Sequence, residues 1–144
     1  MTIAEIVKSP GLRLAFVLWL VAIHSFLVGI GLIIRPTTLM QLFAFNPCTE
    51  RFFPVQGGVF HIVMVAAYVM AAVDVDRFRC LVVYSIIVKG IATVFLFTYF
   101  LAVDSIWLVL VSGLCDGAMG VVIYWCLRSY SRMQVNPNCS PGAA

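Results

Sequence analysis

The chain has 144 residues, of which 63% are hydrophobic and only 10% are charged. Ordinary soluble chains have roughly 45–50% apolar and about 25% charged residues, and a small soluble domain has too much surface to hide such an excess of apolar side chains. The formal net charge is only +3 and the basic residues lie beside apolar segments, so the composition excludes a soluble domain and argues against nucleic-acid binding.

Four long apolar runs predict an all-α, four-helix transmembrane bundle. The runs are residues 14–34, 52–73, 81–103 and 105–127. Each has 21 to 23 residues, and roughly 20 residues are needed to cross the hydrocarbon core of a bilayer. Backbone groups in lipid must be hydrogen-bonded within the chain, so each run is expected to be helical. No small-x-small cleavage site follows the first run, which is therefore expected to be retained as a helix.

The segments between and after these runs complete the predicted organisation. Pro36 favours the first turn of a helix, and the mixed polar and apolar residues 36–45 predict a short interfacial helix between the first and second spans. Asp104 and Ser105 form the whole predicted link between the third and fourth spans, which makes those two helices antiparallel neighbours. We expect residues 1–132 to be a single transmembrane domain and residues 133–144 to be a flexible tail.

The distribution of basic residues predicts the orientation of the chain. Six basic residues flank the span ends on the side of the termini: Lys8, Arg13, Arg77, Arg79, Arg128 and Arg132. Only Arg35 and Arg51 flank the opposite ends. Cytoplasmic loops carry the excess of Lys and Arg, so we expect a multi-pass protein of the cell membrane with both termini in the cytoplasm.

Each predicted span carries one ionisable residue near its middle: His24, His61, Lys89 and Asp116. Lys89 lies 15 residues before Asp104 and Asp116 lies 12 residues after it. At about 1.5 Å per residue, their depths differ by about 4–5 Å, which long side chains bridge. An unpaired Lys or Asp at this depth costs roughly 2.5–3.5 kcal/mol, so we predict that these two residues pair.

Two interpretations of these polar residues stay open. The Lys89–Asp116 pair is either a structural ion pair that fixes helix register or part of a ligand-binding site, for which the candidate residues are His24, Gln56, His61, Lys89 and Asp116. His24 and His61 are either hydrogen-bonded between helices or ligands of one haem. No third ligand accompanies them for zinc, so neither a metal site nor a catalytic residue is assigned, and no cofactor is specified.

Short motifs support a family resemblance. A basic start to the first span, the proline break at Arg35-Pro36, and Gln56-Gly57-Gly58 at the opening of the second span resemble small four-helix membrane proteins of the DoxX-like group. The resemblance implies a four-helix bundle, and some of these relatives are linked to quinone-coupled redox complexes. Glu50-Arg51 with Gln56 also resembles membrane glutathione transferases, but Gly58 and His61 depart from the pattern of that family.

Together these features favour a ligand-binding or lipid-binding membrane protein, or an accessory subunit of a membrane complex. The alternatives are a redox component that handles quinone or haem, and a small transporter or proton relay. The expected partners are the lipid bilayer, a hydrophobic small molecule such as a quinone, and another membrane protein or a second copy of the chain. No enzymatic motif is recognised in the sequence.

Overall fold

Helices account for nearly all of the described residues. The computed structural model describes residues 9–34 and 52–135. They form four helices, α2 (Pro10–Ile34), α4 (Phe52–Val73), α5 (Arg79–Ala102) and α6 (Trp107–Val135). All four are long and apolar enough to cross a membrane. The predicted all-α class and four long apolar helices are therefore confirmed among the described residues, whereas the expected interfacial helix at 36–45 lies outside them.

The observed helix boundaries agree best with the predicted boundaries for the second span and least well for the fourth. Helix α4 has the predicted bounds of 52–73. Helix α2 begins four residues early, at Pro10, because a proline fits the first helical turn. The link between α5 and α6 is residues 103–106, so it is four residues long rather than two. Helix α6 continues to Val135, past the predicted end at 127 and into the segment expected to be a flexible tail.

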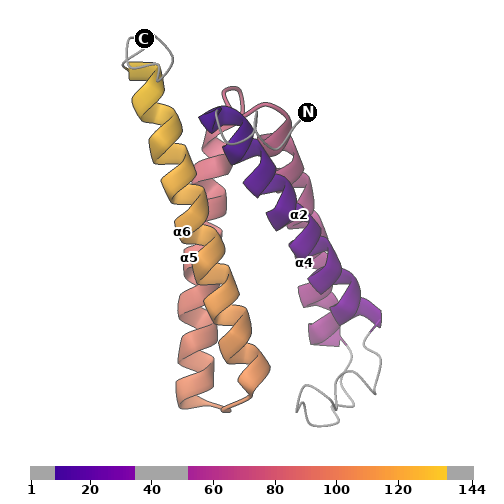
Figure 1. Ribbon diagram of the computed structural model, residues 1–144. Helices are drawn as coiled ribbons and strands as arrows, with labels where there is room; N and C mark the ends of the chain where they lie inside the picture. Colours follow the sequence, from indigo (N-terminus) through magenta and orange to yellow (C-terminus); the bar gives the residue numbers. More distant parts are fainter. Residues whose placement is uncertain (1–8, 35–51, 136–144) are drawn as a thin grey trace.

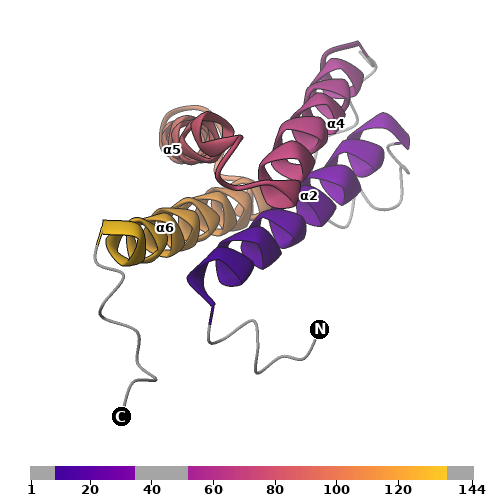
Figure 2. The same cartoon turned by 90° about the horizontal axis from the view of Figure 1, so that it is seen from above.

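The four helices pack as two antiparallel pairs (Figures 1 and 2). The first pair is α2 with α4, and the second pair is α5 with α6. Between the pairs, α2 contacts α6 and α4 contacts α5, and these contacts are much less extensive than those within a pair. The start of α2, the end of α6 and the connection from α4 to α5 lie at one end of the molecule, here called the proximal end (Figure 1).

Glycines allow the close approach of helices within each pair. A Cβ atom added to Gly29 of α2 lies 2.9 Å from the carbonyl oxygen of Gly58 in α4. In the second pair, a Cβ added to Gly113 lies 3.3 Å from Leu96, and one added to Gly120 lies 3.3 Å from Cβ of Lys89. Small residues let helices in lipid approach closely, and Gly113, Gly117 and Gly120 place such residues on the face of α6 that contacts α5.

The hydrophobic core that joins the two pairs lies in the proximal half of the molecule. Its buried members come from all four helices and from the α4–α5 connection: Leu14, Leu18, Val21, Ala22, Tyr68, Ala71, Ala72, Val75, Val82 and Ile123. These residues lie early in α2 and α5 and late in α4 and α6, and these segments meet at the proximal end. Dense packing of this kind resists the separation of helices.

The half of the molecule away from the proximal end is here called the distal half. Packing in this half lies mainly within each helix pair. The buried Gly29 and Gly58 contact each other's helices, and the buried Gly113 contacts Leu96 and Phe97 of α5. No member of the shared core among the described residues lies in this half. The two pairs diverge towards the distal end in Figure 1.

A polar network ties the α4–α5 connection to the end of α6. Tyr130 donates a hydrogen bond to Asp76 (2.7 Å), and the Gln134 amide donates to the second carboxylate oxygen of Asp76 (2.8 Å). The Arg79 guanidinium donates to Ser131 (2.6 Å) and to Gln134 (3.3 Å). These five residues, here called the proximal clasp, explain why α6 stays helical beyond residue 127.

Candidate functional site

Buried polar side chains from all four helices lie near the middle of the structure. Those grouped around the ion pair are Ser25 of α2, Tyr68 of α4, Lys89 of α5 and Asp116 of α6, with exposed fractions of 1%, 1%, 2% and 7%. Ser85, one turn before Lys89 on α5, is also fully buried. The residues grouped around the ion pair lie at the boundary between the shared core and the distal half, and we call these four the midplane cluster. Buried polar groups are costly without partners, so their convergence from four separate helices calls for an explanation.

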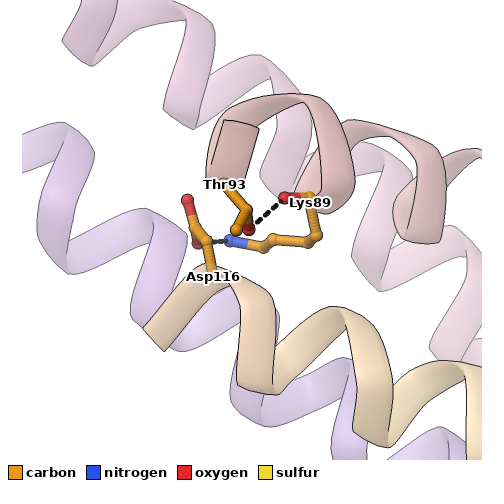
Figure 3. Close-up of polar contacts among 3 residues, drawn as sticks. All are labelled: Lys89, Thr93 and Asp116. Atoms are coloured by element: carbon orange, nitrogen blue, oxygen red, sulfur yellow. Dashed lines mark hydrogen bonds and ion pairs between the residues drawn. The ribbon is translucent and has the colours of Figure 1, made fainter. Parts of the chain in front are cut away.

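Lys89 and Asp116 form the predicted ion pair. The Lys89 Nζ atom lies 2.5 Å from Asp116 Oδ1, and both side chains are at least nine-tenths buried (Figure 3). One turn along α5, the Thr93 hydroxyl donates to the Lys89 carbonyl oxygen at 2.7 Å. The ammonium also lies 5.9 Å from the ring centroid of Tyr68, within range of a cation–π interaction. The pair therefore lies within the second helix pair and presents its charges to Tyr68 of the first.

One polar atom beside the ion pair has no partner. His24 Nδ1 is buried and makes no hydrogen bond within the described part of the chain. The Ser25 hydroxyl has no partner of good hydrogen-bond geometry, but it lies within hydrogen-bonding reach of the Tyr68 hydroxyl. More than 90% of buried polar groups in proteins are hydrogen-bonded, so His24 Nδ1 marks a place where hydrogen-bonding capacity remains unused.

The two predicted histidines lie beside the cluster, His24 next to Ser25 on α2 and His61 two turns distal to Tyr68 on α4. His24 and His61 are half-buried, and both experience the charges of Lys89 and Asp116. The structure thus brings together four of the five residues predicted from the sequence. The fifth, Gln56, is exposed and lies three turns before Tyr68 on α4, off the face that points inward. No described contact joins Gln56 to the cluster.

Sequence reasoning missed Ser25 and Tyr68. Neither is ionisable at neutral pH, so neither stands out in an apolar run. A periodicity argument identifies both in retrospect. Tyr68 follows His61 by seven residues, which places both on one face of α4, and Ser25 adjoins His24 on α2.

The cluster borders the shared core on its proximal side. Leu14, Leu18 and Val82 of that core are fully buried. Ser85 of α5, one turn before Lys89, is also fully buried there, and its hydroxyl donates a hydrogen bond to the Leu81 carbonyl oxygen at 2.7 Å.

The chemistry available at the cluster is binding by hydrogen bonds and charge. Among the described residues, no group of three or more His, Cys, Asp or Glu side chains is placed to hold a metal ion. The cluster offers ammonium and hydroxyl donors, and carboxylate, imidazole and hydroxyl acceptors. Such a small set of polar groups in apolar surroundings is typical of ligand sites, where polar groups fix orientation and apolar surface supplies affinity.

Comparisons with known proteins give no relative for this chain. No protein-family model, no curated protein and no solved structure matches it. The four apolar helices fit the class of small multi-pass integral membrane proteins.

Proposed function

We propose that the chain is a four-helix transmembrane bundle that binds a small molecule at the midplane cluster, without catalysing a reaction. The observation that carries the proposal is the convergence of Ser25, Tyr68, Lys89 and Asp116 from four helices, with His24 Nδ1 buried beside them and unpartnered within the described part of the chain. An ion pair that served only to fix helix register needs no unpartnered neighbour. A ligand supplies the missing hydrogen bond and explains why the cost of burying this nitrogen is tolerated.

Native mass spectrometry of the purified protein in nanodiscs tests this proposal. The parent chain should retain a bound small molecule, and the neutral double variant Lys89→Met/Asp116→Leu should lose it while keeping its helix content. Thr98→Val is a matched control because the Thr98 hydroxyl is exposed and bonds only to its own helix. A parent protein without any bound molecule, or a double variant that retains it, contradicts the proposal.

The proposal includes a cytoplasmic location for both termini. The basic Arg79, Arg128 and Arg132 lie at the proximal end, where the positive-inside rule favours the cytoplasm. With single-cysteine variants in intact cells, we expect an impermeant thiol reagent to label Cys80, which is exposed at the start of α5, only after permeabilisation. Cys48, outside the described residues, should be labelled directly. The reverse labelling pattern would show the opposite orientation in the membrane and would not contradict the fold.

A haem-binding or quinone-linked redox role is the second candidate. Its support is the position of His24 and His61 on neighbouring helices at the edge of the cluster, together with the DoxX-like motifs at Arg35-Pro36 and Gln56-Gly57-Gly58. Protein expressed with haem supplied should then show a Soret band that His24→Ala abolishes. A colourless preparation contradicts this candidate.

A transmembrane proton relay fits the arrangement less well. A relay needs polar groups towards both faces of the membrane, whereas the shared core lies between the cluster and the proximal end. Leu14, Leu18 and Val82 offer no group that can carry a proton, and the buried Ser85 hydroxyl donates its hydrogen bond to Leu81 O of its own helix. A site that is closed on one side favours binding over transport.

A further inference from the structure

The end of helix α6 carries a basic face that lies apart from the midplane cluster. Arg128 and Arg132 are exposed, and their guanidinium groups make no hydrogen bond or ion pair within the described part of the chain. We infer that this face binds the phosphate of an anionic phospholipid, in the leaflet that surrounds the proximal end. The inference goes beyond the proposed function and does not rest on ligand binding at the midplane cluster.

The length of α6 places both arginines at the level of the lipid headgroups. Its 29 residues extend over about 43 Å at about 1.5 Å per residue, which exceeds the roughly 30 Å of the hydrocarbon core. Apart from Asp116, no charged residue lies between Asp104 and Arg128. The apolar stretch between these two positions is long enough to cross the core, so Arg128 lies at its edge and Arg132 lies one turn further out.

The proximal clasp holds the other side of these last turns. Its residues on α6 are hydrogen-bonded to the α4–α5 connection. At about 100° per residue, Arg128 and Arg132 lie on the opposite side of α6 and share a face with two apolar residues before them. Because the clasp fixes the rotation of the helix end, it holds both guanidinium groups on the outside of the bundle. This face is here called the α6 stripe and consists of Val121, Trp125, Arg128 and Arg132.

The charge of the α6 stripe suits a lipid with a net negative charge. After Asp116, α6 contains no acidic residue. The acidic residues described at the proximal end lie on the α4–α5 connection, where Asp76 is bonded within the clasp and Asp74 accepts a hydrogen bond from the Arg77 backbone. Guanidinium groups four residues apart on one helix face can share a phosphate through charge-assisted hydrogen bonds. A choline group would add a third positive charge, so phosphatidylglycerol is a better partner than phosphatidylcholine.

The apolar half of the α6 stripe suits the acyl chains of the same lipid. Trp125 and Val121 have 74% and 67% of their surfaces exposed. They lie about one and two turns deeper in the bilayer than Arg128, and tryptophan is enriched at this level of membrane helices. A molecule that contacts the arginines and this apolar surface together must be amphipathic. This requirement favours a phospholipid over a free phosphate or a nucleic acid.

Quenching of Trp125 fluorescence by brominated lipids tests the inference. The reporter is the full chain with Trp19→Phe and Trp107→Phe, in phosphatidylcholine bilayers with a small fraction of either brominated phosphatidylglycerol or brominated phosphatidylcholine of the same acyl chains. We expect phosphatidylglycerol to bind beside Trp125 roughly tenfold more strongly than phosphatidylcholine, the preference expected for two basic residues at the membrane surface. The matched chain that retains only Trp19, which is exposed on α2, should show no such preference.

Two double variants distinguish this site from the general charge of the proximal end. Arg128→Gln/Arg132→Gln should abolish the preference. Arg13→Gln/Arg77→Gln removes the same charge from the same end and should leave the preference unchanged, because Arg13 lies near Cys126 on another face of α6 and Arg77 lies on the α4–α5 connection. All four arginines are exposed, so circular dichroism should show the helix content of the parent in both variants.

Three outcomes overturn the inference. Equal quenching by the two brominated lipids shows that the α6 stripe does not select a negative charge. An equal loss of preference in both double variants assigns the effect to the overall charge of this end. Loss of the preference on addition of inorganic phosphate, but not of chloride at the same ionic strength, assigns the arginines to a soluble anion.

Discussion

The proximal and distal halves of this protein are held together in different ways. In the proximal half, a shared core and the proximal clasp of Asp76, Arg79, Tyr130, Ser131 and Gln134 join both helix pairs. In the distal half, each pair packs on itself. The midplane cluster lies at this boundary. The comparison teaches that the contacts that join the two helix pairs are concentrated in the proximal half, and that the proposed binding cluster lies at the edge of that half.

The largest loss in the free energy of unfolding is expected when the Lys89–Asp116 ion pair is broken. Lys89→Met or Asp116→Leu alone leaves one buried charge unpaired and should reduce the free energy of unfolding by roughly 3–5 kcal/mol. The double variant strands no charge and should recover most of this loss. The measurement is reversible unfolding in mixed micelles. Additive losses in the double variant show that the two residues do not stabilise one another.

Truncating the proximal core should cost nearly as much. Leu18 is fully buried in that core, and Leu18→Ala should destabilise the protein by about 2–5 kcal/mol through lost contacts and a cavity. Leu27 lies on the same helix with 63% of its surface exposed to the surroundings, so Leu27→Ala is the control and should have a small effect. Equal losses in thermal unfolding would mean that the proximal core does not dominate stability.

Two glycines on α2 test how closely α2 and α4 pack in the distal half. An added Cβ at Gly29 meets the carbonyl oxygen of Gly58 at 2.9 Å, so Gly29→Ala should push α2 from α4 and cost about 1–3 kcal/mol. Gly31→Ala meets nothing within 4 Å and should be neutral or stabilising by up to about 1 kcal/mol, because alanine favours the helix. Similar unfolding temperatures for the two variants contradict the close approach of the first pair.

The smallest effect is expected at the proximal clasp, and it should depend on pH. The hydrogen bond from Tyr130, followed by that from Gln134, lowers the pKa of Asp76. The ionised carboxylate therefore stabilises the fold above its unfolded-state pKa of about 3.9, and this contribution disappears as the pH falls through the lower folded-state pKa. Tyr130→Phe should be slightly less stable than the parent near neutral pH and indistinguishable at strongly acidic pH.

A matched tyrosine provides the control for this measurement. Tyr124 lies on the same helix and is exposed, so Tyr124→Phe should follow the parent at every pH in thermal unfolding experiments. A pH-independent difference between Tyr130→Phe and the parent would show that the effect does not depend on the ionisation of Asp76.

The sequence was sufficient for the features that depend only on position along the chain, such as the length of an apolar run. Apolar length alone located α4 to the residue, and the cost of charge in lipid, with a short link, was enough to pair Lys89 with Asp116. The extension of α6 was not predicted, because it depends on hydrogen bonds from Tyr130 and Gln134 to Asp76, more than 50 residues away.

The membership of the cluster was only partly predictable for a related reason. Depth along a helix follows from counting residues, but the direction of a side chain around the helix depends on how the pairs pack. Gln56 shares the polar character of the cluster and is exposed, whereas Ser25 and Tyr68 lie in the apolar interior. The separate packing of the distal halves arises from the Gly29–Gly58 and Gly113–Leu96 contacts, which are properties of the folded structure.

The placement of the ion pair within α5 and α6 has a consequence for biosynthesis. Lys89 and Asp116 are 27 residues apart in one continuous hairpin, so each charge meets its neutralising partner as soon as that hairpin leaves the ribosome. Helix α5 entering lipid alone carries an unpaired ammonium, and α6 alone carries an unpaired carboxylate, whereas the two together enter as a nearly neutral unit. Release of these two helices into the bilayer in a single step, before they pack on the first pair, therefore avoids the free-energy cost of an unpaired charge in lipid.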